Sequence, residues 1–278
     1  MSNNLRERLA CAKETLLLVS GLVADAEETK GLLPAEAVSQ FKNLGNCWTG
    51  VKHWNQLLDA REMQRSVLTD LERRTDQDDW VEYLGAKVPF TIVRLLAVQA
   101  YLAVHWSLAD GMAAMVADVL SVENKLKDPK RKPNLHAMID GDQAANAIAH
   151  VAYNTIRLMY GKEIALSYAL RNYFLHEGPS EEFFEDRSSR SRFEISPNGW
   201  KLLAERPGKN LIKNAETRRA DWSPGPGSDL REIFDTCQEG MDNALGILVG
   251  TACQVGIVHL LFVLGKEHEI PLALTPLT

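Results

Sequence analysis

Three polar residues near the end of a predicted helix could carry out acid–base chemistry at a phosphate group: Arg171, Asn172 and His176. Imidazole titrates near neutral pH, so His176 is suited to act as a general acid or base. The rigid donor fork of Arg171 could hold a phosphate and stabilise the extra negative charge of its transition state. The amide of Asn172 could orient the histidine or the phosphate. This set requires neither a metal ion nor a cofactor, and we expect neither.

The helix that must position these residues is predicted from about Lys162 to His176, and Gly178-Pro179 stops it. Asn172 and His176 are four residues apart and therefore share one face. Arg171 and His176 are five apart, which is about 140° around a straight helix. One straight helix therefore does not direct both at the same phosphate. Either the last turn frays, or two motif helices form a composite site across a two-fold axis.

The pattern R-N-x-x-x-H from Arg171 to His176 resembles the active-site motif of the HEPN superfamily (higher eukaryote and prokaryote nucleotide-binding). That superfamily includes many metal-independent ribonucleases of toxin and defence systems. The resemblance implies an all-α homodimer with one cleft at its interface, and the small residues Ala165 and Ala169 would permit close approach there. It also implies attack of the ribose 2′-OH on the adjacent phosphate, which leaves a 2′,3′-cyclic phosphate and a 5′-hydroxyl. An antitoxin or an activating partner could control such a protein.

Basic loops could hold the RNA substrate. Arg187, Arg190 and Arg192 follow the motif most closely, and we predict that they bind RNA phosphates, although such loops are most often simply solvated. Phe184 and Trp222 could stack on bases, or could equally pack inside the protein.

Composition limits the other classes of function. With 278 residues, 45% of them hydrophobic and 24% charged, the chain is an ordinary globular protein. A net charge of −6 argues against a protein coated in positive potential, so RNA must be met by local basic patches. Four widely spaced cysteines without a C-x-x-C pair indicate reduced thiols in a cytoplasmic protein. The absence of phosphate-binding glycine motifs makes an NTPase or a dinucleotide-binding enzyme a weak hypothesis.

Apolar residues recur at helical spacing almost throughout, so we expect an all-α helical bundle forming one domain over residues 1–278. Residues 1–85 would add an N-terminal helical layer. Residues 180–227 would form a loop-rich insertion, in which Phe193 to Leu203 could be a small β-hairpin centred on Pro197-Asn198-Gly199.

Glycines and caps predict where the helices begin and end. Gly45 is expected to break or kink one helix, and Gly161 is expected to separate the motif helix from the helix before it. One long helix is expected from about Pro89 to Leu120, and Ser228 is expected to cap a final helix over about 229–264. His105 is expected to be a core histidine with its hydrogen-bonding groups satisfied.

The uncharged segment Ala244 to Leu264 is long enough to span a bilayer. A buried core helix is the favoured interpretation, because Thr251, Gln254 and His259 would be costly in lipid. If this segment did span a bilayer, the protein would be a membrane-associated helical protein, which is one alternative to a nuclease. The other alternative is a non-catalytic RNA- or nucleotide-binding protein.

Overall fold

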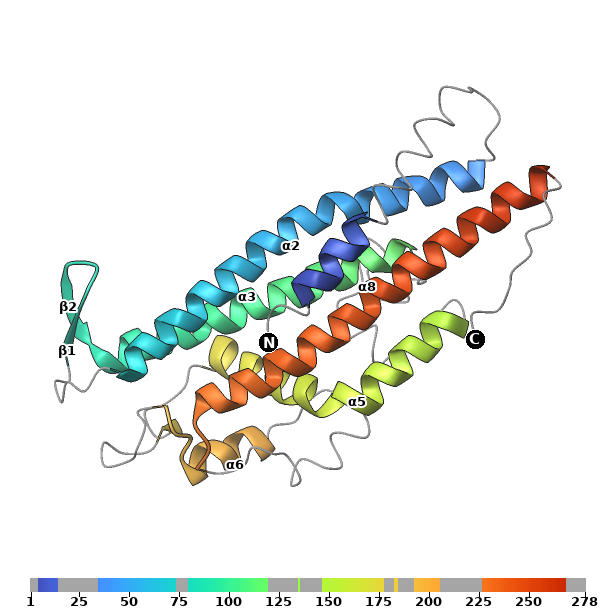
Figure 1. The fold of residues 1–278 in the computed structure, drawn as a ribbon. Coiled ribbons are helices and arrows are strands. Elements are labelled where there is room, and N and C mark those ends of the chain that lie inside the picture. Colours follow the sequence, from blue (N-terminus) through green and yellow to red (C-terminus); the bar gives the residue numbers. More distant parts are fainter. Residues whose placement is uncertain are drawn as a thin grey trace. The chain divides into compact units, whose positions relative to one another are not determined.

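The fold is all-α, as predicted, and the described residues also contain one small β-hairpin (Figure 1). The computed structural model describes residues 5–14, 35–73, 80–119, 135, 147–177, 183–184, 193–205 and 227–268. In chain order the elements are α2 (Ala35–Arg73), β1 (Trp80–Tyr83), β2 (Ala86–Pro89), α3 (Phe90–Val119), α5 (Ala147–Asn172), the π-helical turn η1 (Tyr173–Glu177), α6 (Pro197–Glu205) and α8 (Leu230–His268). Residues 5–14 are also helical.

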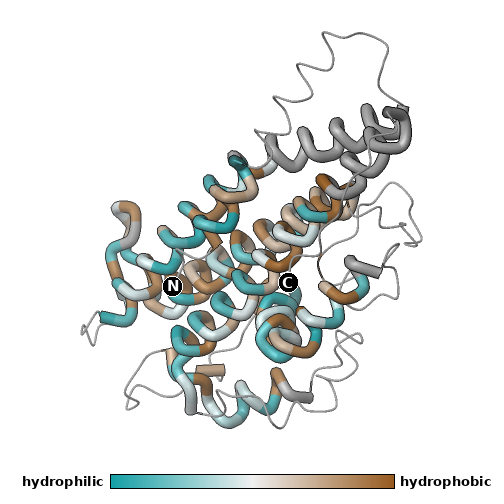
Figure 2. Tube along the Cα trace, turned by 45° about the vertical axis from the view of Figure 1, so that its right-hand side comes forward, coloured by the Kyte–Doolittle hydropathy of each residue, from teal (hydrophilic) through white to brown (hydrophobic). Residues whose placement is uncertain are grey.

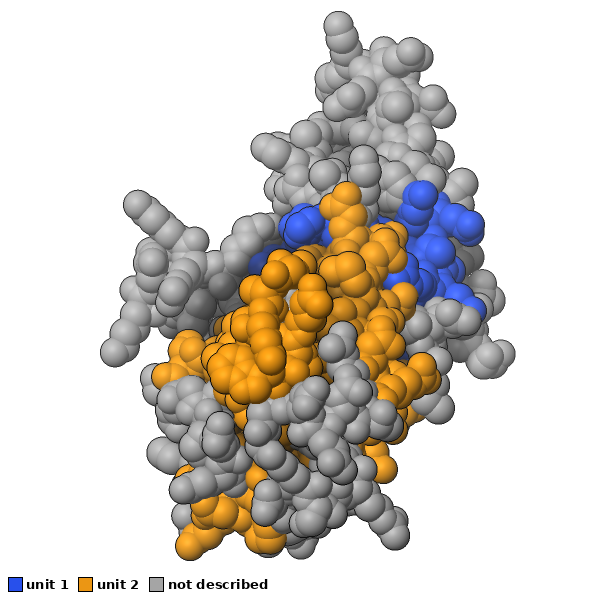
Figure 3. Space-filling view, turned by 90° about the vertical axis from the view of Figure 1, so that its left-hand side faces the viewer, with its two compact units in different colours: residues 1–54, 111–155, 244–278 blue, residues 55–110, 156–243 orange. Residues whose placement is uncertain are grey.

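The chain divides into two compact units (Figure 3). Unit 1 comprises residues 1–54, 111–155 and 244–278, and unit 2 comprises residues 55–110 and 156–243. The four long helices each contribute residues to both units. The single domain and the N-terminal layer remain predictions.

Unit 2 contains the motif, and parts of α2, α3, α5 and α8 form its core. Along the described helices, hydrophobic and hydrophilic residues alternate around the turns (Figure 2), as expected for helices that bury one face. Tyr101 of α3 stacks on Phe234 of α8 with ring centroids 4.5 Å apart. A side chain in place of Gly240 of α8 would collide with Glu163 of α5. These contacts show that α8 packs directly against both α3 and α5 in this unit.

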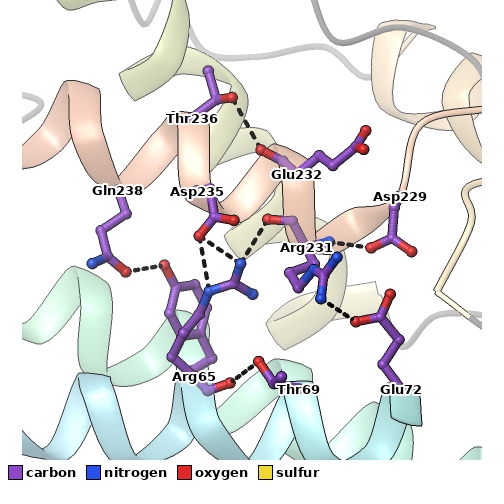
Figure 4. A network of polar contacts seen from close by, with 10 residues as sticks. Arg65, Thr69, Glu72, Asp229, Arg231, Glu232, Asp235, Thr236 and Gln238 are labelled. Carbon is purple, nitrogen blue, oxygen red and sulfur yellow. Dashed lines mark hydrogen bonds and ion pairs between the residues drawn. The ribbon is translucent and has the colours of Figure 1, made fainter. Parts of the chain in front are cut away.

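Ion pairs join α2 to α8 within unit 2. Arg61 is fully buried and donates two hydrogen bonds to the carboxylate of Asp242, at 2.7 and 2.8 Å. Burial raises the pKa of Asp242, and the Arg61 guanidinium opposes that rise. Nearby, Arg65 Nε donates to Asp235 at 3.1 Å and its guanidinium also donates to the Arg231 carbonyl at 3.0 Å (Figure 4).

The helix breaks predicted at Gly161 and, as one of two alternatives, at Gly45 are wrong. Helix α2 is continuous through Gly45, and α5 is continuous through Gly161, which is buried. Glycine in a helix interior costs only about 1 kcal/mol relative to alanine. Tertiary packing along a long helix outweighs that cost.

The β-hairpin predicted between Phe193 and Leu203 is also wrong. Ser196 caps α6, since its Oγ accepts a hydrogen bond from the Gly199 N–H at 2.8 Å, and Pro197 occupies the first helical position. Proline is favoured there because its missing N–H would have had no intrahelical partner. The segment 180–227 is therefore partly helical in its described residues.

The observed hairpin lies instead between α2 and α3. Strands β1 and β2 pair antiparallel, with Trp80 opposite Pro89 and Tyr83 opposite Ala86. Its two turn residues, Leu84 and Gly85, both have positive φ, at 51° and 77°. This backbone suits the twist of a two-residue hairpin, but it is unusual for leucine.

The predicted long helix is confirmed as α3, and the final helix is confirmed as α8. The N-terminal cap of α8 differs from the prediction, because Asp229 rather than Ser228 accepts the hydrogen bond from the Arg231 N–H, at 2.7 Å. An acceptor at this position satisfies one of the unpaired N–H groups of the first turn.

Of the described residues, one segment is long and apolar enough to cross a membrane by length and composition. It is Phe90–Ala117 of α3, and 56% of its most apolar window is buried. In the segment that starts at Ala244, the side chains of Leu248, Val249 and Ala252 are buried. That burial agrees with the core-helix interpretation for this part of α8.

Candidate functional site

The motif lies where α5 changes into a π-helical turn. Arg171 and Asn172 are the last two residues of α5, and His176 lies in the following turn, Tyr173–Glu177. Arg171 and Asn172 are half-buried, whereas His176 is exposed. The histidine is therefore accessible to a substrate.

The π turn changes the geometry expected for a straight α-helix. In a π turn each carbonyl bonds five residues ahead, so residues five apart stand about one turn from each other. Arg171 and His176 therefore come closer to a common face than a regular α-helix would place them. This last turn is widened rather than frayed, and single π turns are frequent at functional sites.

Arg171 is held against aromatic rings of unit 2. Its guanidinium carbon lies 5.6 Å from the centroid of Trp106 and 5.9 Å from that of Tyr168. Trp106 is itself buried, and its indole N–H donates to Ser167 Oγ at 3.0 Å. A cation over an aromatic face gains about 0.5–1 kcal/mol at exposed sites and more when desolvated. Trp106 therefore restricts where the guanidinium can point.

The π turn is fixed from two sides. The side-chain amide nitrogen of Gln99 on α3 donates to the carbonyl of Phe174 at 2.7 Å. The ring of Phe174 is fully buried, and Tyr173 stacks on Phe183 with centroids 4.9 Å apart. The backbone that leads to His176 is thus tied both to α3 and to an aromatic cluster.

Phe184 belongs to this aromatic cluster. It is buried, it contacts Phe174, Phe183 and Phe193, and the Arg94 guanidinium lies 3.9 Å from its ring centroid. Of the two alternatives for Phe184, packing is therefore confirmed and stacking on bases is wrong.

Several predicted binding residues lie outside the described part of the chain. They are Arg187, Arg190, Arg192 and Trp222. Their roles remain predictions.

His105 is buried, as predicted, but it is not satisfied. Neither ring nitrogen has a hydrogen-bond partner among the described residues. Its ring stacks on Tyr101 with centroids 5.7 Å apart, and burial, together with the charge of Arg61, lowers the pKa of His105 well below its ordinary value. The imidazole is therefore neutral in the folded core.

Within the described residues, no hydrogen bond or ion pair joins the side chains of Arg171, Asn172 and His176 to one another. What the tertiary structure adds is support from α3, through Gln99 and Trp106, which sequence reasoning missed. A polar residue interrupting the apolar run of α3 was the available signal for Gln99. In the same described ranges, no group of three or more His, Cys, Asp or Glu side chains is placed to hold a metal ion.

Comparisons with protein-family models, with curated proteins and with solved structures find no match to this chain. The motif and its surroundings are therefore the basis for assigning a function.

Proposed function

We propose that the protein is a metal-independent endoribonuclease whose site contains Arg171, Asn172 and His176. The observation that carries the proposal is the complete R-N-x-x-x-H pattern at a widened helix end, with His176 exposed and the Arg171 guanidinium 5.6 Å from the ring centroid of Trp106. An exposed imidazole can transfer protons and an oriented guanidinium can stabilise negative charge on phosphorus, and both functions suit phosphodiester cleavage.

In the proposed reaction, the ribose 2′-OH loses its proton and its oxygen attacks the adjacent phosphorus. The new bond from O2′ to phosphorus forms as the bond to O5′ breaks, and the leaving oxygen takes up a proton. His176 would transfer one of these protons, as general base or general acid, and the other would be exchanged with water. Arg171 would stabilise the charge on the pentacoordinate phosphorus, and Asn172 would orient the imidazole or the phosphate. The products are a 2′,3′-cyclic phosphate and a 5′-hydroxyl.

The proposal includes a homodimer in which two motif helices form one cleft, and a role in a toxin or antiphage defence system. These features derive from the resemblance to HEPN proteins. RNA is the proposed substrate, an antitoxin or activator is a proposed partner, and the proposed location is the cytoplasm.

Cleavage of labelled single-stranded RNA in EDTA tests the proposal. We expect metal-free cutting that His176→Ala and Arg171→Ala each reduce by at least about 100-fold, because each would remove a group acting on the transition state. His150→Ala is the matched control, since His150 is an exposed histidine at the other end of α5. Equal cutting by wild type and His176→Ala would refute the assignment. RNA binding by wild type without cleavage would instead support the non-catalytic alternative.

A membrane-associated protein is the second candidate, supported by the apolar segment Phe90–Ala117. Two large residues of this segment, Ile92 and Leu96, are 48% and 53% exposed and lie four residues apart on one face. Flotation with liposomes tests this candidate. Protein that stays at the bottom of the gradient without detergent would refute it.

A further inference from the structure

One face of α3 contacts α5 and η1 at two points in unit 2. Gln99 donates to the Phe174 carbonyl, and Trp106 donates to Ser167 Oγ. Gln99 and Trp106 are seven residues apart, and their partners are seven residues apart in the opposite chain direction. Seven residues are about two helical turns. These two side chains therefore lie on one stripe of α3, which runs antiparallel to α5 and η1.

At one end of this stripe, the ring of Trp106 lies beside the guanidinium of Arg171. At the other end, Gln99 donates a hydrogen bond to the backbone just before His176. The last four carbonyls of a helix have no intrahelical donor, and a carbonyl left unpaired in a partly buried position is costly. Phe174 is among the last residues of the helical segment, and the donor for its carbonyl comes from a different helix.

A donor on a neighbouring helix does more than satisfy a carbonyl. It fixes the position of the π turn relative to α3, and therefore relative to the ring that holds Arg171. His176 follows Phe174 by two residues, so the direction of its side chain depends on this backbone. Without the hydrogen bond, the turn could return to regular α-helical bonding, which would rotate His176 away from Arg171.

We propose that Gln99 is a positioning residue for the nuclease site and acts on His176 through the Phe174 carbonyl. The inference rests on the proposed function for its catalytic consequence. Its structural consequence, the orientation of the His176 ring, can be measured without any activity.

Gln99→Met tests the inference, because methionine has nearly the same shape but cannot donate a hydrogen bond. Gln56→Met makes the same change at an exposed position of α2 and serves as the control. Gln99→Asn keeps the amide but is one methylene shorter, which gives a second and milder variant. Gln99→Lys supplies a donor again and tests rescue.

We expect Gln99→Met and Gln99→Asn to lower kcat by about 10- to 100-fold with little change in KM, since small misplacements of a reacting group have effects of this size. In protein labelled at histidine, both variants should shift the NMR ring signals of His176, identified by their loss in His176→Ala. Gln56→Met should change neither measurement, and Gln99→Lys should recover most of the rate.

The outcomes separate the two proposals. If the wild type does not cleave RNA but both Gln99 variants shift the His176 signals, the proposed function fails and the positioning role stands. If the His176 signals stay in place in Gln99→Met and Gln99→Asn, the positioning role is overturned, whether or not the wild type cleaves RNA.

Discussion

Removing Asp242 should destabilise the protein strongly, because it leaves the buried cation of Arg61 without its partner. The Arg61 side chain is 0% exposed, and its two hydrogen bonds to Asp242 are 2.7 and 2.8 Å long. Hydrogen bonds to charged groups contribute about 1.5–3 kcal/mol each, and breaking a buried pair costs about 3–5 kcal/mol. We therefore expect Asp242→Ala to lower the free energy of unfolding by about 4 kcal/mol.

That loss corresponds to a large shift in melting temperature. The entropy of unfolding is about 2.1 cal/mol/K per residue, or roughly 0.6 kcal/mol/K for 278 residues. A loss of about 4 kcal/mol then lowers Tm by roughly 7 °C. Urea unfolding followed by circular dichroism gives the free energy, and thermal unfolding gives Tm.

Asp235→Ala is the matched control, because Asp235 pairs with Arg65 between the same two helices but its side chain is 65% exposed. An exposed pair contributes at most about 1 kcal/mol. Replacing both members of the buried pair, in Arg61→Met/Asp242→Leu, should leave stability within about 1 kcal/mol of wild type or raise it, since both desolvation costs disappear. Equal losses in Asp242→Ala and Asp235→Ala, or a double variant as unstable as Asp242→Ala, would refute the reasoning.

Two further predictions concern the pH dependence and the packing of unit 2. Burial lowers the pKa of His105 well below 6.5, so as the pH falls through 6.5 the unfolded chain comes to bind up to one proton more than the folded chain at this residue. The stability contributed by His105 is therefore complete above pH 6.5 and falls by up to about 1.4 kcal/mol per pH unit below it. His105→Phe should remove this part of the pH dependence without loss of stability at pH 7. Urea unfolding between about pH 5 and 7.5, the range in which the unfolded histidine changes its charge, measures this dependence. A variant whose stability depends on pH as strongly as that of the wild type would contradict the prediction. Gly199→Ala should cost about 1–3 kcal/mol, because the new Cβ would collide with the Phe183 backbone, whereas Asn198→Ala, at an exposed position, should stay within about 0.5 kcal/mol. Equal unfolding midpoints for these two variants would show that the Phe183 backbone can move away.

The sequence alone was sufficient for the features that depend on local periodicity. The all-α class and the long helix α3, observed at Phe90–Val119 where about 89–120 was predicted, follow from apolar residues at helical spacing. The motif residues and their place near a helix end were also available from the sequence. Ser196 followed by Pro197 is also typical of a helix N-terminus, but the Asn198-Gly199 pair that comes next favours the interpretation as a hairpin turn. The helix N-terminus was the correct interpretation, because Ser196 caps it through the Gly199 N–H.

Only the tertiary structure decided how the motif is presented. Gly161 stays helical because its helix is packed on other helices, and no local signal reports that packing. Within the π turn at Tyr173–Glu177, the carbonyl of Phe174 accepts a hydrogen bond from Gln99, which is 75 residues away in the sequence. Hydrophobic periodicity specifies which face of a helix is buried, but not which side chain of another helix will meet a given carbonyl. The sequence thus supplied the candidate chemical groups, while packing against α3 set the direction in which they point.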